Sequence, residues 1–152
     1  MAYAETAKVK LGGREQAAWL AQLEAEHDNL RAALEWSQET QPVFGLRIAV
    51  ALVDFWDTRG YLNEGRRWLD KTLQATANLN PSPARVDAML GAMAFAVRQS
   101  ELDVSKQILN ESLDLARAID YRAGIARGLT GRGVIVEFFE GDLSKAEALY
   151  TE

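Results

Sequence analysis

Apolar side chains recur along most of this chain at alternating intervals of three and four residues. Between positions 14 and 38 one such stripe holds Leu20, Leu23, His27, Leu30 and Leu34, with Trp19 and Trp36 at its two ends. This spacing places the side chains on one face of a helix. It predicts a helix over residues 14–38. A short helical turn or two is expected within residues 1–11, ended by two glycines.

Helix-ending residues divide the rest of the periodic pattern. Pro42 and Pro81 cannot continue a helix, and Gly60 can adopt the left-handed conformation that closes one. Ser82 is expected to cap the helix that starts at Pro83, and Asn63 to cap the one before it. The predicted ranges are 43–58, 63–77, 83–99, 103–119, 122–140 and a last helix beginning at 143. The β-branched run at 133–136 has helical flanks, so helix is favoured there over strand.

Three turns align with one another at a spacing of 40 to 41 residues, with Leu62, Leu102 and Leu143 at equivalent positions. Three residues further on each has a small side chain, which is expected where two paired helices touch: Gly65, Ser105 and Ala146. A period of this length indicates stacked supersecondary units. The sequence therefore predicts an all-α fold, a right-handed α-solenoid of antiparallel helix pairs with about seven helices. The expected organisation is an N-terminal segment, 1–42, packed on repeats 43–80, 81–120 and 121–152.

The composition narrows the classes of partner. Of the 152 residues, 26% are charged and the formal net charge is −5, with no dense run of lysine and arginine. Nucleic-acid binding by this chain is therefore not expected. There is no cysteine, which removes disulfides, thiolate nucleophiles and thiolate metal ligands. Neither a signal peptide nor a long apolar run is apparent, so a cytoplasmic location without membrane contact is expected.

The turn Gly141-Asp142-Leu143 followed by Ala146 resembles the tetratricopeptide repeat, in its longer version of about 40 residues. The segments 26–36 and 55–69 resemble the region that follows the ATPase in large bacterial regulators of the STAND type. That resemblance implies a sensor or interaction region between an ATPase and an effector, which is often a DNA-binding domain. One departure is clear: Val53, Met93 and Val134 stand where the repeat has Gly or Ala, so the paired helices are expected to lie further apart.

Single polar residues give little support for catalysis. His27 is the only histidine, and its place in the apolar stripe favours the edge of the core over a metal or catalytic role. Glu24, Glu26 and Glu35 lie off the stripe and are expected on a solvated face. The tryptophans are expected in the core, with Trp56 the leading exception. No nucleophile–base pair is present, so we expect no enzyme, no cofactor and no metal.

Two other groups of residues leave alternatives open. Arg59, Arg66 and Arg67 form the densest basic spot, which suits a phosphate or an acidic peptide but is better explained by ion pairs to Asp70 or Glu64. The glycines between 124 and 133 do not follow a strand, so close helix packing explains them better than a phosphate loop.

The tetratricopeptide resemblance also implies a concave groove lined by the first helix of each pair. Carried over by the turns, the groove positions are Arg47, Val50, Asp54, Asp57 and Thr58, then Asp87, Leu90, Ala94, Val97 and Arg98, then Gly128, Gly131, Ile135, Phe138 and Phe139. The strongest binding candidates are Arg47, Asp54, Asp57, Asp87, Arg98 and Phe138. The implied function is docking of a protein, a peptide or a neighbouring domain, or sensing of a ligand. The alternative is a structural spacer between an ATPase and an effector. A homodimer through the apolar helix at 143–150 is also expected.

Overall fold

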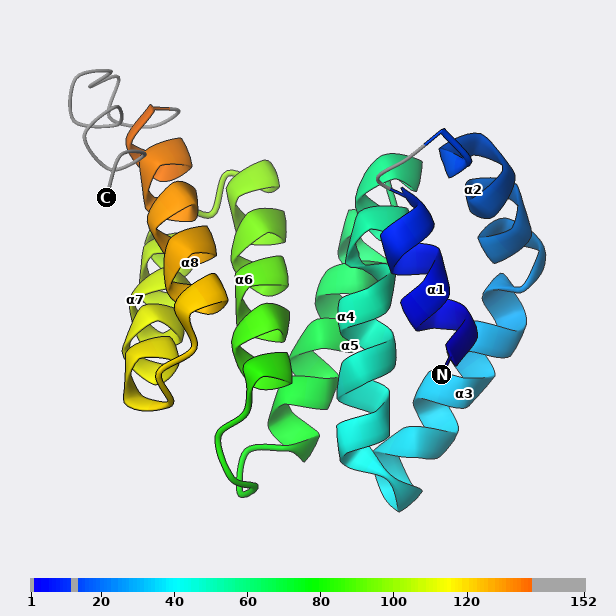
Figure 1. Cartoon of the computed structure of the whole chain (residues 1–152), viewed down its shortest axis with the longest axis horizontal. Helices are drawn as coiled ribbons and strands as arrows, with labels where there is room; N and C mark the ends of the chain where they lie inside the picture. Colours follow the sequence, from blue (N-terminus) through cyan, green and yellow to red (C-terminus); the bar gives the residue numbers. More distant parts are fainter. Residues whose placement is uncertain (1, 12–13, 138–152) are drawn as a thin grey trace. The chain divides into compact units, whose positions relative to one another are not determined.

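The computed structural model describes residues 2–11 and 14–137, and within these ranges the chain forms helices and no strand (Figure 1). The helices are α1 (Ala2–Leu11), α2 (Gln16–Ala25), α3 (His27–Thr40), α4 (Pro42–Arg59), α5 (Leu62–Ala75), α6 (Pro83–Arg98), α7 (Leu102–Ala118) and α8 (Arg122–Ile135). The all-α prediction is thus confirmed. The chain divides into two compact units, Met1–Leu79 and Asn80–Glu152. The expectations for Phe138, Phe139, the third turn, Ala146 and the apolar helix at 143–150 concern positions outside the described residues.

The helix predicted over 14–38 is in fact two helices, α2 and α3, which meet at a bend. At Glu26 the backbone has φ −95° and ψ 4°. Backbone hydrogen bonds continue across the bend, from Glu26 N to Gln22 O at 3.0 Å and from Leu30 N to Glu26 O at 2.9 Å. No glycine or proline marks this position. Because His27, the next residue, packs against rings from elsewhere in the unit, tertiary contacts explain the bend better than local sequence does.

The helix ends repeat one geometry. Gly60, Ser100 and Asp120 have φ values of 77°, 61° and 52°. In each case the following backbone N–H bonds back to a carbonyl five residues earlier, at 2.8 to 2.9 Å. This is the Schellman motif. It joins α4 to α5, α6 to α7 and α7 to α8 as antiparallel neighbours (Figure 1).

The two capping predictions differ in outcome. Ser82 accepts a hydrogen bond from Arg85 N at 3.3 Å, and Pro83 is the first residue of α6, as expected. Asn63 was wrongly expected to cap α5. That helix begins one residue earlier than predicted, its cap position is Tyr61, and it has no side-chain cap. The preceding Schellman turn already closes the chain tightly at this point.

The first unit is built around α4, on which α1, α3 and α5 all pack. The short helix α1 buries Ala4, Ala7 and Leu11, which are spaced three and four residues apart. From α4 both Phe55 and Trp56 are buried, at 0% and 1% exposure, so Trp56 is not the exception that the sequence suggested.

Trp36 was wrongly placed in the core, since it is 53% exposed. The small residue beside it, Ser37, continues the stripe instead. At this point α3 and α4 approach closely, because a Cβ added at Gly45 would overlap the Ser37 hydroxyl. A tryptophan would not fit between the two helices here.

The second unit packs α6, α7 and α8 around one apolar cluster: Val86, Leu90, Met93, Leu109, Leu113, Ala116 and Ile135. The glycines of α8 allow a close approach. A Cβ built at Gly128 would lie 2.5 Å from Leu113, and one at Gly131 would lie 2.5 Å from Met93. Close packing, as predicted, accounts for these glycines. Their burial also contradicts the groove assignment of Gly128, Gly131, Ile135 and Leu90, all of which belong to the core.

Candidate functional site

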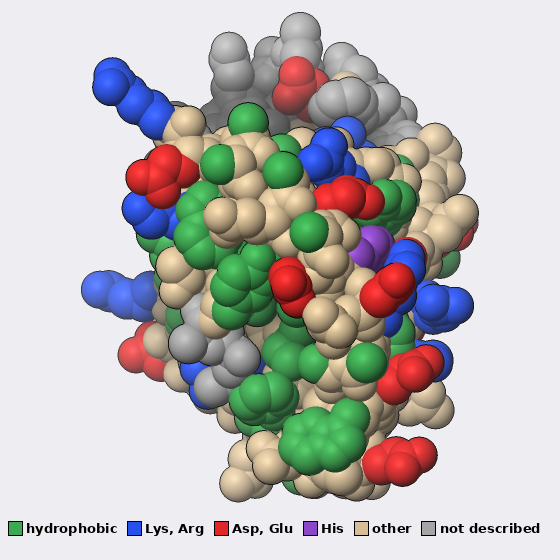
Figure 2. All heavy atoms as spheres, turned by 90° about the vertical axis from the view of Figure 1, so that its right-hand side faces the viewer, with side chains coloured by type: hydrophobic (Ala, Val, Ile, Leu, Met, Phe, Trp, Pro, Cys, Tyr) green, Lys and Arg blue, Asp and Glu red, His purple; other side chains and the backbone are tan. Residues whose placement is uncertain are grey.

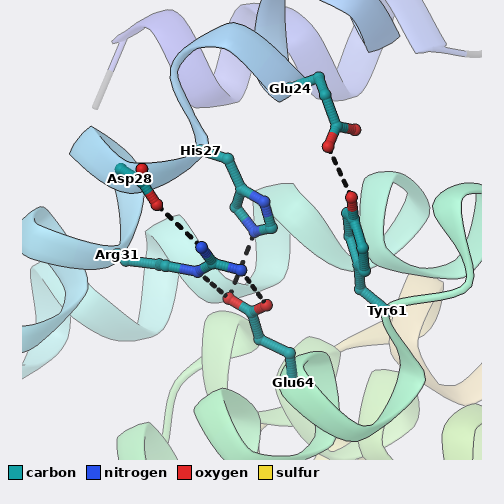
Figure 3. A network of polar contacts seen from close by, with 6 residues as sticks. All are labelled: Glu24, His27, Asp28, Arg31, Tyr61 and Glu64. Atoms are coloured by element: carbon teal, nitrogen blue, oxygen red, sulfur yellow. Dashed lines mark hydrogen bonds and ion pairs between the residues drawn. The ribbon is translucent and has the colours of Figure 1, made fainter.

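The most elaborate polar arrangement in the described part of the chain centres on Glu64, in the first turn of α5 (Figure 3). Arg31 of α3 donates two hydrogen bonds to its carboxylate, from Nε at 2.7 Å and from Nη2 at 2.6 Å. The Glu64 side chain is 15% exposed and that of Arg31 is 40% exposed. A bidentate guanidinium–carboxylate pair fixes orientation as well as charge. It therefore clamps α3 onto α5.

Electrostatics in this pair follow from that geometry. The hydrogen bonds from Arg31 are the largest cause that lowers the pKa of Glu64, and burial opposes them with a smaller effect. Charge interactions with His27 and Arg31 lower this pKa further. In turn, the hydrogen bonds to Glu64 raise the pKa of Arg31 above its ordinary value. Asp28, one turn before Arg31, accepts a further hydrogen bond from Nη1 at 2.8 Å. In the folded chain the contacts thus stabilise the ionised forms of Arg31 and Glu64.

His27 lies beside this pair and is 7% exposed. Its ring packs edge-on against Phe55, with centroids 5.1 Å apart, and lies 5.0 Å from the ring of Tyr61. Its Nε2 is 3.2 Å from Oε1 of Glu64, a distance that allows an ion pair when the imidazole is protonated. The prediction of a histidine at the core edge is confirmed. Its carboxylate neighbour was not foreseen.

The far side of the network reaches the turn between α4 and α5. The Tyr61 hydroxyl donates to Glu24 of α2 at 2.5 Å, and Arg59 Nε lies 3.2 Å from the same carboxylate. The hydrogen bond to Glu24, followed by burial, raises the pKa of the Tyr61 phenol. Glu24 was expected on a solvated face. It is exposed, but it is also tied to two residues of the α4–α5 turn.

This network is better suited to holding helices together than to catalysis or ligand binding. It joins α2, α3 and α5 through groups of both charges, and Figure 2, which looks onto the side of the first unit carrying α1 to α3, shows acidic and basic side chains beside a small exposed part of the histidine. The carboxylate nearest the imidazole is already held by two guanidinium hydrogen bonds. In residues 2–11 and 14–137, histidine, aspartate and glutamate nowhere gather in threes in a way that could hold a metal ion.

A sequence signal for this network exists on two helices. His27 occupies an apolar stripe on α3, and Glu64 lies four residues before buried Trp68, at the edge of the buried stripe of α5. When each of two buried stripes contains one polar residue, the two residues are candidates to contact each other across the helix interface. What the sequence lacks is any mark of the pairing itself, because Arg31 and Glu64 are 33 residues apart.

The six predicted groove residues have different surroundings. On α4, Arg47 is exposed but pairs with Glu5 of α1, so α1 covers that end of the helix. Asp54 is exposed and Asp57 is half-buried. On α6, Arg98 is exposed. Phe138 lies outside the described residues.

Asp87, the remaining candidate, belongs to a small cluster within the second unit. It forms an ion pair with Arg127 of α8, and the Arg127 guanidinium also donates to the Tyr121 hydroxyl at 2.9 Å. Burial, and then the charge of Asp87, raise the pKa of Tyr121. This cluster links α6 to α8 and is not a set of free groups in a groove.

The basic spot resolves into separate contacts. Arg66 pairs with Asp70 at 3.1 Å, as predicted, and Arg59 pairs with Glu24. Glu64, the other expected partner, is taken by Arg31. Arg67 instead lies over the ring of Trp68.

Among known proteins the chain is similar to candidate HTH-type transcriptional regulators from Mycobacterium tuberculosis, strains H37Rv and CDC 1551, and from Mycobacterium bovis. Each is 30% identical over an alignment of 123 residues, and the match covers 75% of this chain and 14% of the relative. The chain thus spans about one seventh of the length of the relatives it matches. No family model and no solved structure matches it. No helix among the described residues is long and apolar enough to cross a membrane.

Proposed function

We propose that this chain is a non-catalytic interaction or sensing module of a bacterial transcriptional regulator, built from tetratricopeptide-like helix pairs. Its partner would be a protein, a peptide or a neighbouring domain of the same regulator, in the cytoplasm. The similarity to candidate HTH-type regulators supports the regulatory context. The resemblance of segments 26–36 and 55–69 to the region after a STAND-type ATPase supports the same context.

One observation carries the proposal: the α4–α5 and α6–α7 hairpins are built alike, 40 residues apart. Gly60 and Ser100 take the same left-handed turn conformation. Five residues after each, a small residue, Gly65 or Ser105, is buried on the second helix. Repeated helix pairs of this kind extend by stacking and present broad surfaces, which favours binding over catalysis.

A structural spacer is the alternative, because the clamp on Glu64 stiffens the first unit through polar contacts without needing a ligand. A module that binds and a module that only separates domains differ in one measurable respect. Binding to the folded state raises the melting temperature further as partner concentration increases, approximately with its logarithm, whereas a spacer has no partner that could do so.

The test is site-specific photo-crosslinking in the cell. A photoreactive phenylalanine analogue is placed at Asp54 on α4 or Arg98 on α6, both exposed, and at exposed Glu39 on α3 as the control. The expected result is an adduct with one identified protein or domain from α4 or α6, absent from the control. The purified pair should then show a concentration-dependent rise in melting temperature. Scattered adducts at all three positions, with no melting shift, would favour the spacer.

A further inference from the structure

The outward face of α5 carries two cations that no carboxylate neutralises. Arg67 and Lys71 are exposed and stand four residues apart, and within the described residues neither forms a hydrogen bond or an ion pair. Their neighbour Arg66 differs, because it pairs with Asp70 on the same helix. Like charges four residues apart on a helix repel each other. Their mutual repulsion therefore opposes this arrangement.

Both cations are held by a single aromatic ring. The guanidinium carbon of Arg67 lies 5.6 Å from the centre of the Trp68 ring, and Nζ of Lys71 lies 5.0 Å from it. Trp68 itself is 2% exposed, so the indole is anchored in the core of the first unit. Cation–π attraction to a fixed ring restricts both long side chains. Part of the entropy that binding would otherwise cost is thus already lost in the free protein.

We propose that Arg67 and Lys71, held over Trp68, form a docking point for an acidic protein segment with two carboxylates one helical turn apart. The inference rests on the proposed interaction function and names the chemistry of the partner. The guanidinium offers a carboxylate two parallel hydrogen bonds, and the ammonium offers a compact charge to a second one. Carboxylates four residues apart on a helix project from Cβ atoms about 5–6 Å apart, the same spacing as the Cβ atoms of Arg67 and Lys71.

Charge complementarity favours a protein partner over nucleic acid. Nucleic-acid affinity comes from many cations that follow a phosphate backbone, whereas this site has two. Two carboxylates one turn apart on an acidic helix repel each other. Two cations at the same spacing are enough to neutralise them. A free anion shares the carboxylate's chemistry, and the experiment separates the two.

The experiment titrates the whole purified chain, at low salt, with an alanine-based helical peptide that carries two glutamates four residues apart. The peptide with two glutamines is its control. Chemical shifts of the Trp68 indole N–H and the Arg67 side chain report binding at the site. The double substitution Arg67→Gln/Lys71→Gln should weaken binding at least about fivefold. The matched pair Arg14→Gln/Arg122→Gln removes two exposed cations elsewhere and should leave binding unchanged.

Charge reversal provides a second test that does not depend on loss of binding. Arg67→Glu/Lys71→Glu should bind the corresponding peptide with two lysines and reject the glutamate peptide. Equal weakening in both glutamine pairs would overturn the proposal, since it would show only general attraction. Displacement of the peptide by an equal concentration of inorganic phosphate would also overturn it, in favour of a free-anion site. If the photo-crosslinks identify a partner but the acidic peptide does not bind, the docking point is wrong and the proposed function stands.

Discussion

Removing the charge of Glu64 should lower the free energy of unfolding by an amount that depends on pH. In the folded chain this carboxylate is 15% exposed and receives two hydrogen bonds from Arg31, at 2.7 Å and 2.6 Å. Glu64→Gln keeps the shape but replaces one charged acceptor by an amide donor that faces the guanidinium. Hydrogen bonds to charged groups contribute about 1.5–3 kcal/mol each to stability, and a fully buried pair costs about 3–5 kcal/mol to break.

Partial exposure reduces that figure. Because Arg31 is 40% exposed and keeps its contact with Asp28, water and Asp28 solvate the guanidinium once Glu64 is neutral. We therefore expect Glu64→Gln to lower the free energy of unfolding by about 2 kcal/mol near neutral pH. The matched control is Asp70→Asn, which removes an exposed carboxylate from an ion pair within α5. It should cost no more than about 0.5 kcal/mol.

The pH dependence tests the cause. The pKa of Glu64 is lowered in the folded chain from its ordinary 4.5, so the folded state holds this proton less tightly than the unfolded state does. The stability from the ionised carboxylate is therefore present above 4.5 and is lost as pH falls through the lowered value. Urea unfolding followed by circular dichroism should show wild type and Glu64→Gln converging at acid pH. A difference that stays constant across that range, or an equal effect from Asp70→Asn, would refute the clamp.

Three further outcomes follow from the described geometry. Ser105→Leu should overpack the α6–α7 contact, where the serine is fully buried, and cost about 1–3 kcal/mol in a thermal melt; an unchanged melt would show the repeat register to be wrong. Gly60→Ala should destabilise by about 1 kcal/mol because φ is 77°, whereas Ser100→Gly should stabilise by a similar amount, both measured by urea unfolding. The Tyr61 phenol should ionise above 10.0 in an ultraviolet titration, and Glu24→Gln should move that ionisation back toward 10.0; no change would exclude the hydrogen bond as its cause.

Helix positions could be predicted from the sequence because each depends on local chemistry. Pro42, Gly60 and Ser82 act on the backbone of their own turns, and each ends or begins a helix as predicted. The bend at Glu26 could not be predicted in this way. No glycine or proline interrupts the sequence there, and the ring contacts made by His27 come from residues 28 and 34 positions further along.

The candidate site was harder to predict from the sequence, for a related reason. A stripe indicates which face of a helix is buried, but it does not say which other stripe covers it. Glu64 was assigned to the neighbouring arginines because they are close in sequence, yet Arg31 reaches it from another helix. The groove assignment failed similarly on α8. Alignment by turns placed Gly128 and Gly131 on an open face. In the structure both lie in the core, where the absence of a side chain leaves room for Leu113 and Met93.

The turns explain why a repeat can persist while its signature residues change. Three turns share the Schellman geometry, but only Gly60 is a glycine, and Ser100 and Asp120 take the left-handed conformation despite their side chains. That conformation costs a non-glycine residue about 1–2 kcal/mol. Each turn also closes hydrogen bonds to the preceding helix and fixes two helices around a buried contact, so the surrounding structure maintains the strained residue. Within this chain the buried positions repeat where the turn residue does not: Leu69 and Leu109 are equivalent and both buried, whereas Gly60 is replaced by Ser100. The spacing of buried residues therefore identifies the repeat in this chain better than the turn sequence does.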